Sequence, residues 1–111
     1  MKDHPTIAEV QKQACWALCN LSVNPENKVK LSNLGVIEAL LKAMKDHPAH
    51  PGVQEGACGA LFNLSANNAQ NKVKISNLGA EDPVRRAMAA ANAADDTKKY
   101  GQKLLDKLAQ C

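Results

Sequence analysis

The sequence predicts an all-α fold in which similar helical units stack into a solenoid. The first observation is a repeat: VQKQACWALCNLS at residues 10–22 returns as VQEGACGALFNLS at residues 53–65, and NKVKLSNLG at residues 27–35 returns as NKVKISNLG at residues 71–79. This period in the low forties is typical of helical solenoids. The second observation is composition, since 45% of the residues are apolar but only 3% are aromatic. Leu, Val, Ile, Ala and Met must therefore build the core.

The opening segment, residues 7–22, is predicted to form one helix. Its apolar residues recur every three or four positions, which places them on one side. That side comprises Val10, Ala14, Ala17, Leu18 and Leu21. Because repeats bury their faces only against neighbours, this side needs a covering partner.

The next segment carries clear signals for the start and end of a helix. Asn24 is a suitable N-cap with Pro25 at the first helical position, and Gly35 suits a left-handed stop. A short helix is therefore predicted between them. Residues 36–47 form a second helix, in which apolar side chains follow the i, i+3, i+4, i+7 spacing before prolines break it. These side chains are Ile37, Leu40, Leu41 and Met44, and the prolines are Pro48 and Pro51.

A third helix is predicted from about Gly52 to residue 66. Its apolar side comprises Val53, Ala57, Ala60, Leu61 and Leu64. Each unit of about 43 residues thus contains three helices. The chain begins in mid-unit: residues 1–22 are the third helix of a truncated unit, residues 23–66 are a full unit, and residues 67–111 are the last unit.

The last unit is more polar than the unit before it. Glu81 and Arg85 stand where the preceding unit has Ile37 and Leu41. Its final helix keeps Leu104, Leu105 and Leu108 on one side but is otherwise charged. Because terminal repeats need a polar outer face for solubility, residues 67–111 are predicted to be a C-terminal capping repeat.

NKVKLSNLGVIEALLKAM followed by VQEGACGALFNLS resembles the armadillo repeat, the family of the repeats in importin alpha and beta-catenin. Armadillo units have a short first helix ending in glycine, an apolar second helix, and a third helix reading roughly A-x-W-A-L-x-N-L. The resemblance covers nearly the whole chain and weakens after about Gly79. HEAT repeats are the near alternative, but they typically have two helices per unit. The resemblance implies a right-handed α-solenoid of about two and a third repeats, acting as a non-catalytic protein–protein interaction module.

The resemblance also implies where a partner binds, because armadillo proteins bind an extended peptide along the inner groove formed by their third helices. The groove positions here are Lys12, Trp16, Asn20, Glu55, Gly59, Asn63, Lys103 and Lys107, with Lys99 as an alternative to Lys103. Asn20 and Asn63 match the asparagine whose amide hydrogen-bonds a peptide backbone. Trp16 matches the tryptophan that packs against Lys or Arg stems, and Gly59 does not.

Other roles stay open for these residues. The asparagines could instead form helix–helix hydrogen bonds, and Trp16 could fill the gap between helices. Gly56 and Gly59 either weaken their helix or make space for a close neighbour. Since Glu55 is the one clear acidic member among several lysines, an acidic or neutral peptide suits the groove better than a basic one.

An alternative function is self-assembly. The side of the first helix that carries Val10, Ala14, Ala17, Leu18 and Leu21 lacks the two helices that would normally cover it. A second copy of the chain could cover it through an isologous contact, which would make the protein a homodimer.

Charge and hydropathy exclude two classes of protein. The net charge is only +3, and the basic residues are scattered among acidic ones, which argues against nucleic-acid binding. RNA-reading solenoids need aromatic and basic side chains in every unit, and this chain has one Trp. No apolar run approaches the roughly 20 residues of a membrane span, and the N-terminus lacks the apolar core of a signal peptide. A cytoplasmic or nuclear location is therefore expected.

Metal binding, cofactors and catalysis are not expected. Four cysteines, Cys15, Cys19, Cys58 and Cys111, could suggest disulfides or a metal site. Because Cys15 and Cys58 occupy equivalent places on predicted buried helix faces, they are predicted to be free thiols that act as small hydrophobic residues. His47 and His50 have a spacing compatible with zinc, but no further ligands lie nearby in the sequence. The chain lacks a phosphate-binding loop and a Ser-His-Asp or Cys-His set. The neighbouring acids Asp95 and Asp96 open a predicted helix, where they complement the macrodipole.

Overall fold

The computed structural model describes residues 5–48, 50–66, 68–90, 93 and 95–109, with residues 5–9 and 11 described by their backbone alone. This part of the chain is helical and contains no strand. The helices are α1 (Pro5–Leu21), α2 (Pro25–Asn33), α3 (Val36–Asp46), α4 (Pro51–Ser65), α5 (Ala69–Asn77), α6 (Glu81–Ala89) and α7 (Asp95–Ala109). The expected all-α solenoid of helical repeats is confirmed.

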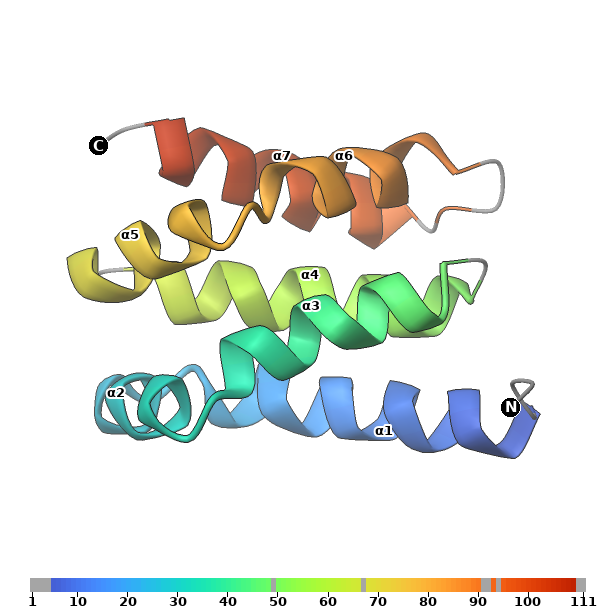
Figure 1. The fold of residues 1–111 in the computed structure, drawn as a ribbon, viewed down its shortest axis with the longest axis horizontal. Coiled ribbons are helices and arrows are strands. Elements are labelled where there is room, and N and C mark those ends of the chain that lie inside the picture. The colour runs from blue at the N-terminus through green and yellow to red at the C-terminus, as the bar shows by residue number, and fades with distance from the viewer. Residues whose placement is uncertain (1–4, 49, 67, 91–92, 94, 110–111) are drawn as a thin grey trace.

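The helices form two layers (Figure 1). The third helices of the three units, α1, α4 and α7, lie side by side and run in the same direction, with α4 packed between the other two. Helices α3 and α6 cover one side of this layer, and the short helices α2 and α5 lie near its C-terminal end. We call the covered side the outer side and the opposite side the inner surface. Among the described residues, no helix has the length and apolar character that crossing a bilayer requires.

The turns follow the local signals in the sequence. The side chain of Asn24 accepts hydrogen bonds from the backbone N–H groups of Glu26 and Asn27, so it caps α2 as predicted. Gly35 has φ of 83° and Gly79 has φ of 76°, in the left-handed region that glycine adopts without steric cost. These stops turn the chain from the first helix of each unit into the second.

Helix α4 lies at the centre of the core. Its apolar side is fully buried, and comprises Val53, Ala57, Ala60, Leu61 and Leu64. The side chains of Ile37 and Leu40 from α3, Val84 from α6 and Leu104 from α7 belong to the same cluster. A single continuous core therefore joins the units, as solenoid stacking requires.

Glycine allows α1 and α4 to approach closely. A Cβ atom at Gly56 would lie 2.9 Å from the Cβ of Cys15 and 3.3 Å from the backbone nitrogen of Trp16. Real Cβ atoms do not approach this closely, so an alanine would push the two helices apart. Of the two roles open for Gly56 in the sequence, the structure supports space for a close neighbour.

Polar side chains join successive elements in the same way in both units. The amide of Asn27 donates to the carbonyl of Leu21 at 2.9 Å, and the equivalent amide of Asn71 donates to the carbonyl of Leu64 at 3.0 Å. Each bond fixes a first helix against the end of the preceding third helix. Between units, the ammonium of Lys74 donates to the carbonyl of Ser32 at 3.0 Å.

Candidate functional site

The burial pattern fixes the register of the last third helix. Buried positions of α4 recur in α7 after 44 residues, where Thr97, Gly101, Leu104 and Leu105 are buried and Leu108 is half-buried. In this register Lys99, Lys103 and Lys107 are equivalent to Glu55, Gly59 and Asn63. The three lysines are exposed or half-exposed, and therefore lie where the sequence predicted the groove.

The inner surface is identified by the partly exposed residues of α4. Most of α4 between residues 52 and 64 is buried, and its outer side is covered by other helices. The exceptions share one face of the helix and are Gly52, Glu55, Phe62 and Asn63. Because the outer side is covered, this face must point away from α3 and α6.

An aromatic group occupies the centre of this surface. The rings of Phe62 on α4 and Tyr100 on α7 lie with centroids 6.2 Å apart and planes tilted by 30°. The ammonium of Lys103 lies 5.8 Å from the centroid of the Phe62 ring, within the range of a cation–π contact. Trp16 on α1 is half-buried like both rings. All three aromatic residues of the chain are therefore on third helices, and none belongs to the fully buried core.

The structure explains why Gly59 stands where α1 has Trp16. A Cβ atom at Gly59 would lie 3.0 Å from the sulfur of Cys19 on one side and 3.6 Å from the Tyr100 ring on the other. Gly59 is buried between these two neighbours. There is no room for an indole at this position, and Tyr100 fills the space beside it.

The two ladder asparagines have different surroundings. The amide nitrogen of Asn63 donates to the carbonyl of Cys19 at 2.9 Å, which ties α4 to α1. The equivalent Asn20 on α1 is exposed. The side-chain amide nitrogen of Asn63 therefore forms the helix–helix hydrogen bond that the sequence left open as a role. The side-chain carbonyl oxygen of Asn63 has no hydrogen bond to the described residues.

Two carboxyl groups meet near the start of α4 and α7. Burial raises the pKa of Glu55, and a hydrogen bond to Asp96 and the negative charge of that residue raise the pKa further. The positive charge of Lys12 acts in the opposite direction. This end of the inner surface therefore holds two acids and one lysine, whereas Lys103 and Lys107 make the other end basic.

Lys107 also influences a buried lysine. Lys28 is 7% exposed, and its ammonium donates to the carbonyl of Ala66 at 2.7 Å. Burial lowers the pKa of Lys28, and the charge of Lys107 lowers it further. Lys28 of α2 and Lys107 of α7 thus place positive charge near the C-terminal end of α4.

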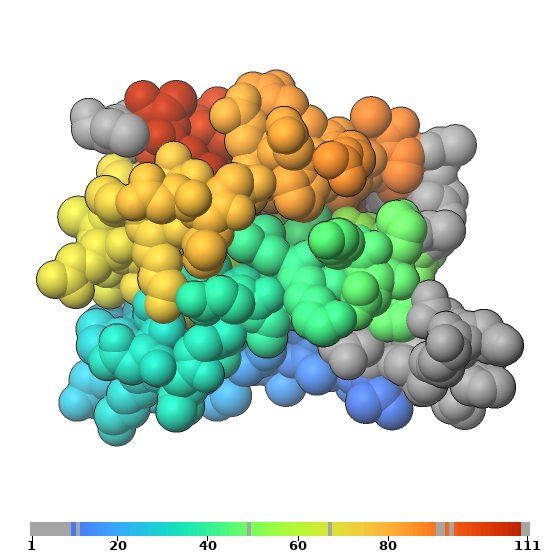
Figure 2. All heavy atoms as spheres, in the orientation of Figure 1, coloured from blue at the N-terminus to red at the C-terminus, as the bar shows by residue number. Residues whose placement is uncertain are grey.

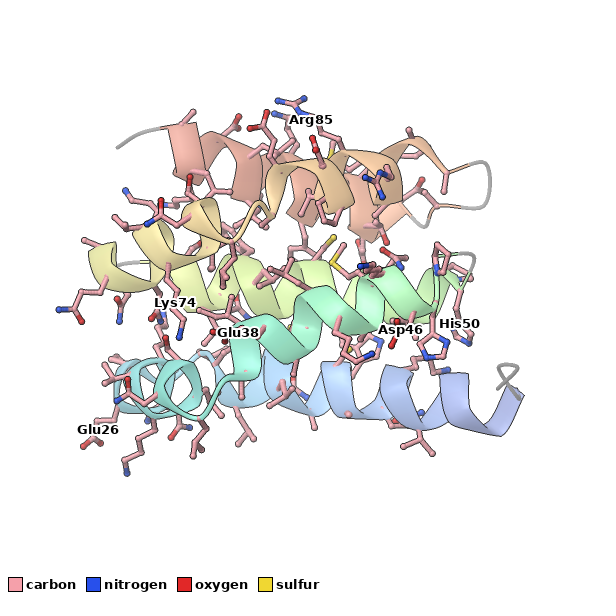
Figure 3. All side chains as sticks on the ribbon, in the orientation of Figure 1. Glu26, Glu38, Asp46, His50, Lys74 and Arg85 are labelled. Atoms are coloured by element: carbon pink, nitrogen blue, oxygen red, sulfur yellow. The ribbon has the colours of Figure 1, made fainter. Side chains whose placement is uncertain are left out.

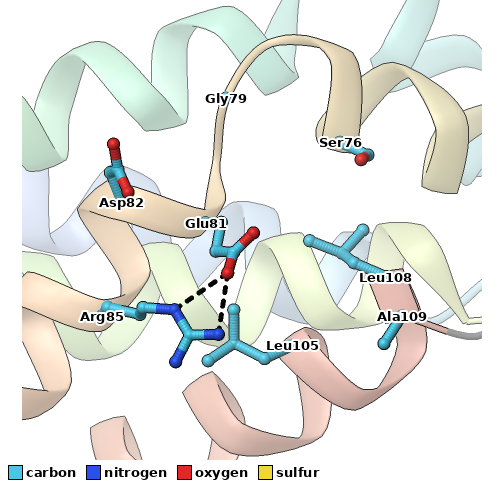
Figure 4. A pocket seen from close by; sticks show the side chains of 8 residues that line it. All are labelled: Ser76, Gly79, Glu81, Asp82, Arg85, Leu105, Leu108 and Ala109. Atoms are coloured by element: carbon cyan, nitrogen blue, oxygen red, sulfur yellow. Dashed lines mark hydrogen bonds and ion pairs between the residues drawn. The ribbon is translucent and has the colours of Figure 1, made fainter.

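Two hollows of the described structure lie away from the inner surface. One is lined by Leu41, Met44, Leu78 and Ala87, with charged side chains around it, between α3 and α6; Figure 2 shows this outer face, where green atoms of α3 meet orange atoms of α6. On the same face the ammonium of Lys74 lies 3.5 Å from the carboxylate of Glu38 (Figure 3). The second hollow has a volume of about 310 Å³ and lies at the C-terminal end of the chain, where the Glu81–Arg85 ion pair forms part of its lining (Figure 4).

The described cysteines are buried in the core, and His50 caps a helix. Burial raises the pKa of Cys15 to about 11, and burial with the nearby Cys15 raises that of Cys58 to about 12. Both are free thiols in the core, as predicted, and so is Cys19; Cys111 lies outside the described residues. The side chain of His50 accepts a hydrogen bond from the N–H of Val53 and caps α4. No group of His, Cys, Asp and Glu in the described part of the chain could hold a metal ion.

The structure places the predicted residues as follows. Trp16, Glu55, Asn63, Lys103 and Lys107 are partly or fully exposed on the third helices, whereas Gly59 is buried. On the predicted uncovered face of α1, Val10, Ala14, Ala17 and Leu21 are exposed, and Leu18 is half-buried against the core. The sequence did not indicate that Phe62, Tyr100 and Asp96 lie beside the groove, and it predicted Asp96 only as an acid that opens a helix. The small number of aromatic residues, two of them on predicted third helices near groove positions, was a signal that could have identified the first two.

Residues 24–66 match the family model of the Armadillo/beta-catenin-like repeat. The match begins at the N-cap of α2 and ends one residue after α4, so it spans one complete three-helix unit of the chain. Armadillo repeats generally act in protein–protein interaction as non-catalytic scaffolds. No curated protein and no solved structure matches the chain.

Proposed function

We propose that this armadillo-repeat chain is a non-catalytic module that binds an extended protein segment across the inner surface of α1, α4 and α7. The observation that carries the proposal is the position of the aromatic side chains. Trp16, Phe62 and Tyr100 are the only aromatic residues of the sequence, and all three are half-exposed on third helices. Aromatic side chains are enriched at the centres of protein interfaces because they contribute large contact areas at low entropic cost.

The charges around these rings favour an acidic segment. At the groove positions of the third helices, four lysines, Lys12, Lys99, Lys103 and Lys107, face the acid Glu55, which has Asp96 beside it. Moreover, the carboxyl groups of Glu55 and Asp96 share a hydrogen bond, and burial and the charge of Asp96 raise the pKa of Glu55. Complementary charge increases the rate of association and selects among partners.

Intrinsic fluorescence tests this proposal, because Trp16 is the single tryptophan and lies on the proposed surface. A peptide of about ten alternating Glu and Ala residues spans roughly 33 Å when extended, enough to cross three helices packed 8–10 Å apart. We expect saturable changes in Trp16 emission that weaken with added salt. The matching Lys–Ala peptide should give a much weaker response.

Variants separate the inner surface from the rest of the molecule. Lys103→Ala with Lys107→Ala should weaken binding of the acidic peptide about fivefold, since exposed ion pairs contribute about 0.5 kcal/mol each. The control, Lys42→Ala with Lys45→Ala, removes the same charge from the exposed side of α3. Equal loss in both variants, or no binding of either peptide, would refute the proposal.

Self-association is a second candidate function. It is favoured by one observation, the exposed apolar side of α1 formed by Val10, Ala14, Ala17 and Leu21. An uncovered apolar side of a repeat normally packs against another helix. A homodimer through this side would leave the inner surface free.

A further inference from the structure

We infer that the outer hollow between α3 and α6 binds a tryptophan side chain of a protein partner, whose indole N–H donates a hydrogen bond to the side-chain oxygen of Gln54. This site lies on the outer side of the molecule, so the inference goes beyond the inner-surface function proposed above and does not depend on it. The hollow has a volume of about 810 Å³, within the range of about 300 to 1,000 Å³ that is typical of ligand pockets.

Short side chains on α6 leave this hollow open. Leu41 and Met44 of α3 line it from one side, and Pro83 and Ala87 of α6 line it from the other. Proline and alanine are too short to fill the space in front of the two longer side chains. Leu78, in the turn before α6, completes the apolar lining and is 43% exposed. The hollow is therefore apolar inside and accessible to a partner.

Gln54 of α4 provides a hydrogen-bond acceptor in this lining. Gln54 is only 5% exposed, and its amide nitrogen donates to the backbone carbonyls of Met44 at 2.9 Å and His47 at 3.0 Å. These two bonds use both donors of the amide and so identify the other side-chain atom as the oxygen. That oxygen has no hydrogen bond to the described residues, and unlike the hydroxyl of Thr97 it is not fully enclosed. Because a desolvated acceptor without a partner is costly, a ligand that donates to it gains affinity.

An indole ring has the chemistry that complements this lining. Its body is large and apolar, and its single N–H group donates a hydrogen bond but accepts none. A leucine or phenylalanine side chain would fill the apolar space but leave the oxygen of Gln54 without a donor. A tyrosine hydroxyl would bring a further acceptor beside an amide whose donors are already used. Of the apolar side chains, tryptophan alone satisfies both the shape and the hydrogen bond.

The charges at the rim also favour an indole. Lys45 of α3 and Arg86 of α6 line the hollow, are exposed, and form no ion pair with the described residues. Lys42 and Asp46 neutralise each other through an ion pair of 2.6 Å, which leaves Asp82 as the remaining acid. The rim is therefore positive by one charge. Cations are attracted to the faces of aromatic rings, and most strongly to that of tryptophan.

An NMR titration of the full chain with N-acetyl-tryptophanamide tests the site. This compound carries the indole between two amide groups, as a residue within a protein does. A dissociation constant on the order of 1 mM is expected for a single side chain. The largest shifts should occur at Leu41, Ala87 and the side-chain amide of Gln54. N-acetyl-1-methyltryptophanamide, which lacks the N–H donor, should bind about fivefold more weakly.

Two equivalent leucines provide a matched pair of variants. Leu78 lines the hollow, whereas Leu34 holds the same position in the preceding unit and lies outside it. Both side chains are exposed, so both alanine variants should keep the helical circular dichroism of wild type. Leu78→Ala should weaken binding of N-acetyl-tryptophanamide about fourfold, the effect of one buried methylene group. Leu34→Ala should leave the affinity unchanged.

The possible outcomes separate this inference from its alternatives. Shifts at the hollow, with weaker binding of the methylated compound and of Leu78→Ala, are the expected result. No shifts at the hollow up to about 10 mM, equal binding of the two indoles, or equal losses in the two leucine variants would overturn the inference. Free indole that binds where N-acetyl-tryptophanamide does not would assign the hollow to a small molecule and overturn the protein partner. Shifts around Trp16, Phe62 and Tyr100 instead would place the indole on the inner surface and overturn the site. The Glu–Ala peptide contains no indole, so the inner-surface proposal stands or fails separately.

Discussion

Truncating equivalent leucines in two successive third helices should reduce the free energy of unfolding by very different amounts. Leu21 and Leu64 occupy equivalent positions, 50% and 0% exposed respectively. Leu64→Ala removes a fully buried side chain and leaves a cavity, which costs about 3 to 5 kcal/mol of unfolding free energy. Leu21→Ala loses only half of a transfer free energy of 1.5–3 kcal/mol and leaves no closed cavity, so its cost is about 1 kcal/mol.

Urea unfolding monitored by circular dichroism measures this difference. The protein concentration should be about 1 µM, so that self-association contributes little and Leu21 is measured in the monomer. We expect the midpoint for Leu64→Ala to fall well below that for Leu21→Ala. Equal losses would show that Leu21 is covered in the isolated chain, and that the comparison between α1 and α4 is wrong.

Two further predictions concern polar side chains, the buried Thr97 of α7 and the half-buried Glu55 of α4. The hydroxyl of Thr97 is fully buried and has no hydrogen-bond partner in the described structure, and the equivalent residue of α4 is Val53. Thr97→Val should therefore stabilise the fold by about 1 kcal/mol, which calorimetry would detect as a rise in Tm of roughly 4 °C. Because the pKa of Glu55 is raised, the folded chain retains this proton to higher pH than the unfolded chain, and the associated stability is lost as pH rises above the ordinary value of 4.5. Glu55→Gln should therefore raise Tm at about pH 7 and change it little at about pH 4, and a uniform shift at both pH values would contradict the assignment.

The helices could be predicted from the sequence because their signals are local. Asn24 and Pro25 begin a helix, and Gly35 ends it, through backbone preferences that need no distant partner. The stacking of the units could be predicted from the repeat, since the same apolar pattern recurs in α1 and α4. The burial of Cys15 and Cys58 followed from that pattern as well.

The details of the inner surface depend on contacts between helices and could not be predicted. Glu55 and Asp96 are adjacent only because α4 and α7 pack side by side, and the sequence showed Asp96 merely as a favourable first-turn acid. Tyr100 likewise fills space that only the packing around Gly59 defines. The hydrogen bond from Asn63 to the carbonyl of Cys19 involves a backbone group, whose position a side-chain pattern does not reveal.

Mapping the bound peptide by backbone and side-chain NMR shifts tests the central claim most directly. With the acidic Glu–Ala peptide, we predict the largest shifts at the Trp16 indole, the Asn63 amide and the Tyr100 ring, spread across α1, α4 and α7. Residues of the outer hollow between α3 and α6, such as Leu41 and Leu78, should be unchanged. Shifts concentrated around that outer hollow, with the three third helices unaffected, would contradict the account.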